Sequence, residues 1–127
     1  MITVDDYINQ HLVGHEPKLT DEIQANAAVV CDRANQLMEA SGMDRGLRSG
    51  WRPSAINHGA GGAPHSKHMT GEAVDIEDND GTLDAWCRDN VAVLENIGLW
   101  LEDDTATPTW THVQSVPPRS GHRFFIP

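Results

Sequence analysis

The sequence predicts an α+β fold, with a small antiparallel sheet and helices packed on one face of it. The chain has 127 residues, which suits one domain spanning residues 1–127. Apolar residues recur at helical spacing in its first third, and short stretches of alternating apolar and polar residues follow. The resulting order is helices, strand, loop, strand, helix and strands, which favours helices segregated to one face of a sheet.

Two helices are expected before any strand. Thr3 is followed by acidic residues and predicts a short helix over residues 3–11. Thr20 predicts the N-cap of a long helix over residues 20–41, because acidic residues that suit a helix N-terminus follow it directly. Gly42 is suited to end that helix in a left-handed conformation.

The rest of the chain predicts a sheet interrupted by one loop and one helix. Residues 54–65 are rich in glycine and small residues, so no regular element is expected there. A third helix is expected from Thr82 to Gly98, after a turn. The predicted strands are 47–53, 72–78, 99–102, 109–114 and a last strand or extended tail at 122–127.

Composition excludes some classes of partner. The net charge is −10 and the nine Lys and Arg residues are scattered, so neither nucleic acid nor an anionic membrane is an expected partner. No apolar stretch approaches the ~20 residues that span a bilayer. Cys31 and Cys87 are expected to be free buried thiols. The first residues lack the apolar run of a signal peptide, so we expect a cytoplasmic product, and a monomer.

One stretch, "SKHMTGEAVDI" (66–76), places an aspartate inside a predicted strand. Asp75 lies between Val74 and Ile76, and a buried carboxylate is costly unless a positive group compensates it. His68 precedes a turn that could return it to Asp75, and His112 in "TWTHVQ" is the best third partner. Two histidines and one carboxylate form an arrangement used by catalytic zinc. On spacing alone, an equal alternative to a metal site is that Asp75 caps a turn and His68 is an ordinary core histidine.

Three segments in order carry a family resemblance. "SKHMTGEAVDI" resembles the S-x-H-x-x-G-x-A-x-D motif of the zinc D-Ala-D-Ala carboxypeptidases, which are relatives of vancomycin-resistance dipeptidases, some phage endolysins and the hedgehog signalling domain. "SGWRPSAIN" (49–57) resembles the stretch that precedes this motif, and "TWTHVQ" resembles the segment with the last zinc ligand. The closing "PPRSGHRFFIP" resembles the tail of phage-encoded members. The resemblance runs from about residue 19 to the end and implies a hedgehog/D-Ala-D-Ala peptidase-like fold.

The resemblance also implies roles for single residues. His68, Asp75 and His112 match the zinc ligands, so the implied cofactor is Zn²⁺. Arg52 matches an arginine that holds the substrate peptide or its developing oxyanion, which suits a guanidinium beside a zinc site. Ser66 is assigned to substrate binding or to support of the loop, against the alternative of an ordinary turn serine.

Among the tryptophans, Trp51, Trp100 and Trp110 lie in or beside these segments. We assign Trp110 to the substrate groove, with core packing as the default for all three.

The general base is where the sequence departs from the family. Many members carry Glu or Asp three residues before the last histidine, and Thr109 occupies that position here. A carboxylate within reach of the attacking water is still required. We assign this role to Glu102, then Asp104, with Asp103 and His65 left open, and a solvated acidic turn is the alternative.

The sequence therefore predicts a zinc metallopeptidase that hydrolyses peptidoglycan stem peptides at a D-Ala-D-Ala or an L-Ala-D-Glu bond. An endolysin or virion-associated enzyme, released to act on the cell wall, would fit this prediction. The alternative is a non-hydrolytic, zinc-stabilised binding or phage structural domain of the same fold.

Overall fold

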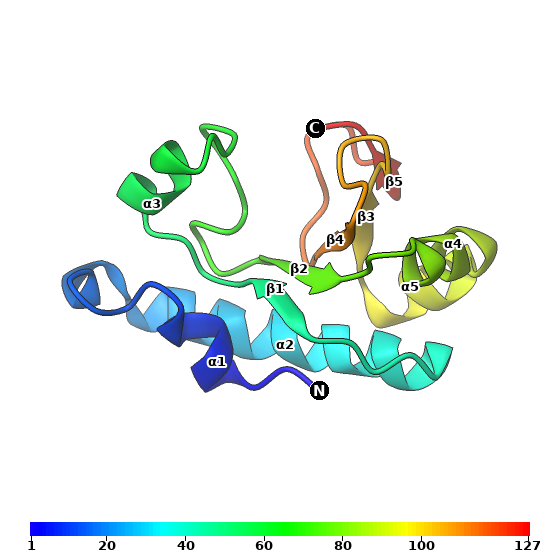
Figure 1. Ribbon diagram of the computed structural model, residues 1–127, viewed down its shortest axis with the longest axis horizontal. Coiled ribbons are helices and arrows are strands. Elements are labelled where there is room, and N and C mark those ends of the chain that lie inside the picture. Colours follow the sequence, from blue (N-terminus) through cyan, green and yellow to red (C-terminus); the bar gives the residue numbers. More distant parts are fainter.

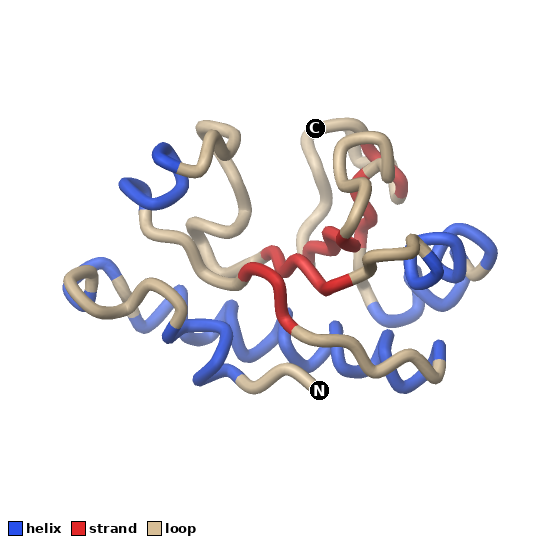
Figure 2. The backbone as a smooth tube through the Cα atoms, in the orientation of Figure 1, coloured by secondary structure: helices blue, strands red, loops and turns tan.

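The computed structural model describes residues 1–127 and confirms the α+β class. Its sheet has five strands in the order β1-β2-β4-β3-β5 (Figures 1 and 2). They are β1 (Leu47–Ser49), β2 (Ala73–Glu77), β3 (Trp100–Glu102), β4 (Trp110–Gln114) and β5 (Phe124–Phe125). Neighbouring strands are antiparallel except for the β3–β5 pair, which is parallel, so the sheet is mixed at one edge.

Five α-helices and one 3₁₀ turn accompany the sheet. They are α1 (Val4–Asn9), the 3₁₀ turn η1 (Glu16–Lys18), α2 (Asp21–Ser41), α3 (Ser54–Gly59), α4 (Thr82–Asp89) and α5 (Val91–Ile97). The long helix α2 runs along one side of the sheet with α1 beside it, while α3 stands on the other side (Figure 1). None of these helices combines the length and hydropathy that a membrane span needs.

The core lies between α2 and one face of the sheet. The Thr20 hydroxyl accepts the N–H of Ile23 and caps α2, and Gly42 ends the helix with φ 71°, as predicted. The apolar side of α2 packs on the side chains that β2 and β4 turn toward it, which include Val74, Ile76 and Val113. The alternate residues of both strands therefore face the opposite side of the sheet.

Two predictions about the helices were wrong. Residues 54–59 form α3 instead of an irregular loop, because Pro53 sets the entry and the Asn57 amide closes the following turn onto the Ala63 carbonyl at 2.9 Å. The helix expected at 82–98 is two helices, broken at Asn90, whose φ and ψ are −131° and 46°. The Asn90 side chain donates to the Trp86 carbonyl at 2.8 Å and so competes with continuation of the helix.

Helix α1 holds the chain just before the functional face. The Trp51 N–H donates to the Tyr7 carbonyl at 3.0 Å, and the Tyr7 hydroxyl donates to the Ala73 carbonyl at 2.6 Å. A Cβ on Gly50 would collide with the Tyr7 carbonyl oxygen, so only glycine permits this approach. The contacts fix the backbone at Gly50 beside the first residues of β2.

Candidate metal centre

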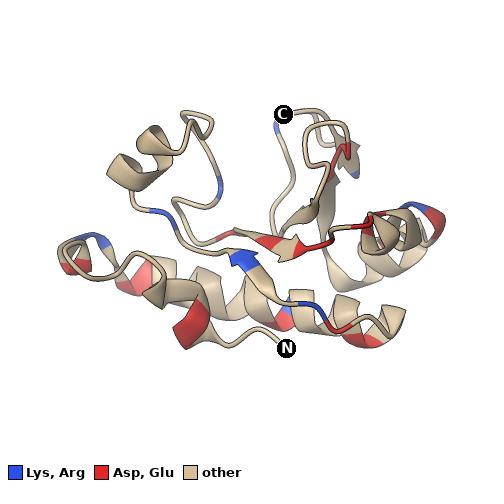
Figure 3. Ribbon diagram, in the orientation of Figure 1, with Lys and Arg blue, Asp and Glu red and all other residues tan.

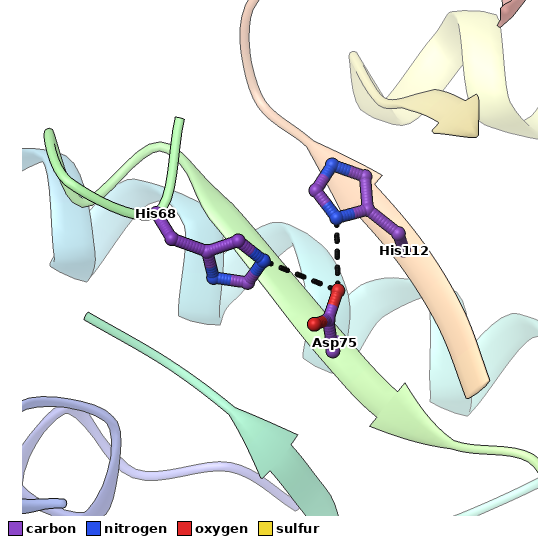
Figure 4. A group of neighbouring side chains, drawn as sticks. All are labelled: His68, Asp75 and His112. Atoms are coloured by element: carbon purple, nitrogen blue, oxygen red, sulfur yellow. Dashed lines mark hydrogen bonds and ion pairs between the residues drawn. The ribbon is translucent and has the colours of Figure 1, made fainter. Parts of the chain in front are cut away.

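The face of the sheet opposite the core brings together His68, Asp75 and His112 (Figure 4). The register of β2 against β4 places Asp75 directly opposite His112, and His68 reaches them from the turn before β2. Asp75 Oδ1 lies 2.8 Å from His112 Nδ1 and 3.2 Å from His68 Nε2. All three side chains are buried, and one potential ligand atom from each lies within 4.8 Å of the others.

In each histidine, the ring nitrogen that points away from Asp75 is hydrogen-bonded to an oxygen. His68 Nδ1 lies 2.8 Å from the Gly50 carbonyl, which can only accept, so the proton is on Nδ1 and the lone pair is on Nε2. His112 Nε2 lies 3.1 Å from Gln114 Oε1. The Gln114 amide is oriented by its own N–H, which donates to the Val116 carbonyl at 3.0 Å. Both rings therefore turn an unprotonated nitrogen toward Asp75 when they are neutral.

The local chemistry fits a bound cation. His68 Nε2 is buried without a hydrogen-bond partner, and its lone pair faces a carboxylate oxygen. Two facing lone pairs repel each other unless a positive charge lies between them or a proton is taken up. Two imidazoles and one carboxylate are the donor set of catalytic zinc sites with an open position. The three residues could therefore hold a zinc ion.

The protonation states of the group are strongly coupled. Burial alone would raise the pKa of Asp75, but the adjacent His68 and His112 hold it well below its usual range. Burial lowers the pKa of His68 despite the neighbouring carboxylate. Burial also opposes charge on His112, yet its hydrogen bond to Asp75 and the negative charges of Asp75 and Glu102 together outweigh burial and raise the pKa of His112. Without a metal, proton uptake is thus favoured at His112 over His68.

Glu102 is the carboxylate beside this group. It lies on β3, and its Oε2 is 3.4 Å from His112 Nδ1, the nitrogen that also faces Asp75. Its side chain is 14% exposed. Burial raises the pKa of Glu102, and the attraction of His112 only partly offsets this effect. A carboxylate with a raised pKa, beside a potential metal position, is suited to accept and return a proton.

None of the other candidate bases pairs with His68, Asp75 or His112. Asp103 accepts the N–H and hydroxyl of Thr105, at 2.9 and 2.6 Å, at the start of a turn. Asp104 is exposed and pairs with Arg88 at 2.8 Å. His65 is exposed on the cleft wall. Thr109 accepts from Arg48 at 3.1 Å.

A cleft of about 1290 Å³ opens above the three residues. One wall is the segment after α3, residues 60–67, and the other is formed by residues 117–120 and 125–127. The substrate-binding candidates Arg52, Ser66 and Trp110 all line this cleft.

These three residues differ in what they contact. Arg52 Nε is buried without a partner. The Ser66 hydroxyl accepts the N–H of His68 at 3.3 Å, which supports the loop. The Trp110 ring lies 4.4 Å from the guanidinium of Arg48. Trp51 is a core residue, 1% exposed.

Two supporting groups escaped the sequence analysis. Gln114 and the Gly50 carbonyl each fix one histidine ring, although neither is among the three candidate ligands of the sequence analysis. Strand alternation places Gln114 on the face of His112, and this was the available signal for Gln114. A backbone carbonyl leaves no such signal in a sequence.

A family model described as Peptidase M15 matches residues 9–113. The chain belongs to the Peptidase M15 family. M15 peptidases are generally zinc-dependent, and the matched residues include His68, Asp75, Glu102 and His112. The segment from Gln114 onward, which forms one wall of the cleft, lies beyond the match. No curated protein and no solved structure gives a significant match.

Proposed function

We propose that this M15 peptidase is a zinc enzyme that hydrolyses peptidoglycan stem peptides, with His68, Asp75 and His112 as the zinc ligands. The observation that carries the proposal is the position of Glu102, a half-buried carboxylate 3.4 Å from the inward nitrogen of His112. Two oriented imidazoles, one carboxylate ligand and one further carboxylate supply the groups needed for hydrolysis of an amide bond.

Each residue has a separate task in the proposed reaction. Bound zinc supplies Lewis acidity that polarises the scissile carbonyl and acidifies water. Glu102 takes a proton from the attacking water while the water oxygen bonds to the carbonyl carbon. Glu102 then gives that proton to the leaving nitrogen as the C–N bond breaks, so the products are a carboxylate and an amine. Glu102, from the neighbouring strand, thereby takes the role of the acid that is missing at position 109, where this chain has threonine.

Arg52 is assigned to binding. Its Nε is buried, lines the cleft and has no partner within the protein, so a group from the substrate can satisfy it. A guanidinium binds a carboxylate or an oxyanion through two parallel hydrogen bonds. Both a D-Ala-D-Ala terminus and the D-Glu of an L-Ala-D-Glu bond offer such a carboxylate, and the enzyme would meet them in the cell wall, as an endolysin does.

The first test follows cleavage of a synthetic stem pentapeptide by mass spectrometry, which identifies the bond that is cut. Glu102→Gln keeps the shape of the side chain but cannot accept a proton, so we expect kcat to fall by about 10²- to 10⁴-fold with zinc content unchanged. Asp104→Asn is the matched control, because Asp104 pairs with Arg88 away from the cleft and its loss should leave kcat unchanged. Full activity in Glu102→Gln would disprove the assignment of the base.

The absence of an acid at position 109 also supports a second candidate, a zinc-stabilised binding domain without hydrolysis. Wild-type protein that contains one equivalent of zinc and cleaves neither bond would favour that candidate. Elemental analysis distinguishes these two zinc-binding candidates from a metal-free structural protein. For the metal-free protein, less than about a tenth of an equivalent of zinc is expected.

A further inference from the structure

The basic side chains of this acidic protein fall into two groups. Five arginines outside the cleft are each engaged with a carboxylate, a backbone carbonyl or an aromatic ring. They are Arg33, Arg45, Arg48, Arg88 and Arg123. The cations that remain are Lys18 and three residues in the cleft.

The three cleft cations are Arg52, Lys67 and Arg119, and none of their side chains has a carboxylate partner or a hydrogen bond within the protein. The acidic side chains of the cleft, Asp75 and Glu102, lie together at the candidate metal centre. The cleft therefore has three basic against two acidic side chains in a chain whose net charge is −10. A bound divalent cation would increase the local excess of positive charge.

The three cleft cations differ in how deeply they are buried and in which part of the cleft they line. Arg52 has a buried Nε and follows β1, whereas Lys67 is half-buried and Arg119 is exposed. Lys67 belongs to the wall after α3 and Arg119 to the wall after β4. Figure 3 shows basic positions on both of these segments, which rise on the same side of the sheet. A peptide that lies across the sheet between the walls would pass Arg52 at depth and these two cations further out.

We propose that Lys67 and Arg119 form a second anion subsite, which binds a carboxylate of the substrate peptide other than the one held by Arg52. The substrate class is then a peptide with at least two carboxylates. This proposal rests on the proposed peptidase function. Lys67 lies within the residues that match the family model, and Arg119 lies beyond them, on the C-terminal wall of the cleft.

The expected contribution is modest because both cations are at least partly in contact with water. Exposed ion pairs of this kind change affinity by roughly 1.5- to 5-fold each. Together the two cations should therefore favour a peptide with the second carboxylate by on the order of 5- to 10-fold. Salt should weaken this preference, since mobile ions screen exposed charges.

The test takes the C-terminal carboxylate of a stem pentapeptide as the group that Arg52 holds. It uses two synthetic pentapeptides that differ at one other group, the α-carboxylate of D-Glu, which is free in one and an amide in the other. Binding is measured by calorimetry with Glu102→Gln protein as purified, so that the result does not depend on turnover. We expect tighter binding of the free acid, and loss of this preference in Lys67→Gln/Arg119→Gln. Lys18→Gln is the control, because Lys18 is also unpaired but lies outside the cleft.

The outcomes separate this proposal from the proposed function. Equal affinity for the two peptides, no detectable binding of either, or a preference that survives the double substitution would each overturn the subsite. Cleavage by the wild type with equal affinities would leave the peptidase and remove the subsite. A preference that disappears in the double variant, in a protein that cleaves neither peptide, would leave the subsite and remove the peptidase.

Discussion

Gln114 determines which nitrogen of His112 faces Asp75. Its amide oxygen lies 3.1 Å from His112 Nε2, and its amide N–H is engaged by the Val116 carbonyl, so the amide cannot turn over without losing that bond. A fixed outer hydrogen bond of this kind sets the tautomer and raises the basicity of a metal-binding imidazole. Gln114 is therefore a positioning residue for the proposed metal site.

Replacement of Gln114 should weaken zinc binding. Gln114→Leu removes the acceptor for the His112 Nε2 proton, and we expect zinc affinity to fall by about 10- to 100-fold, measured by competition with a chelating dye. Gln114→Glu retains an acceptor and should keep most of the affinity. Gln36→Leu is the control, because Gln36 is exposed on α2 and bonds only to Asp32. Unchanged affinity in Gln114→Leu would contradict the role.

The grouping of the three residues proposed as zinc ligands was predicted from strand alternation and one turn, together with the family resemblance that favoured the metal site over its alternative. Asp75 faces away from Val74 and Ile76, and the β2–β4 register then sets it opposite His112. The position of Glu102 depended on the pairing of β3 with β4, which the sequence suggested only through alternation. The Gly50 carbonyl could not be predicted, since its direction depends on how α1 packs.

At the scale of elements, Gly71 joins the turn of His68 to β2. Its φ is 79°, and a Cβ there would lie 2.8 Å from the Ile23 carbonyl oxygen on α2. The turn therefore packs directly on the backbone of the long helix. Any side chain would push the turn away from α2 and displace His68 from Asp75.

Gly71→Ala should destabilise the protein by roughly 2–4 kcal/mol, because strain at positive φ adds to a contact that must shift. Urea denaturation measures the free energy of unfolding. Gly14→Ala is the matched control: its φ is 86° with open space around the added Cβ, so it should show only the strain, about 1 kcal/mol. Equal losses in the two variants would show that the contact with α2 costs nothing.

The elements that the sequence did not predict are those set by tertiary contacts. Helix α2 has its cap, its apolar side and its terminal glycine in the sequence, so its limits were predicted closely. Helix α3 is only six residues long and depends on the turn that Asn57 closes. The break at Asn90 and the parallel β3–β5 pair likewise follow from how neighbouring segments meet.

At the scale of the whole molecule, metal binding and folding should be linked. The three residues proposed as ligands come from β2, β4 and the turn before β2, so the unfolded chain has no comparable site. Zinc at about 100 times its Kd should stabilise the fold by about 2.7 kcal/mol and raise Tm by on the order of 10 °C. Removal of zinc by a chelator should reverse this rise.

The zinc-dependent rise in Tm should shrink as the pH falls from about 8 to about 5.5, because protons compete with the metal for the histidines. The pKa of His112 is raised, so competition begins at a higher pH than for an ordinary histidine. The pKa of His68 is lowered, so its competition follows at lower pH. Differential scanning calorimetry of the zinc-loaded and zinc-free protein at each pH measures this rise in Tm. A gain that is constant with pH would argue against histidine ligands, and His68→Ala should show little gain at any pH.

The C-terminal wall of the cleft has a practical consequence for protein engineering. Ile126 is 82% exposed and lines the cleft with Pro127, whereas the N-terminus lies across the sheet beside α2 (Figure 1). A purification tag or a fused domain placed after Pro127 would crowd the path by which a peptide enters. The same addition before Met1 would leave that path open, so N-terminal fusions are the suitable format for assays of this peptidase.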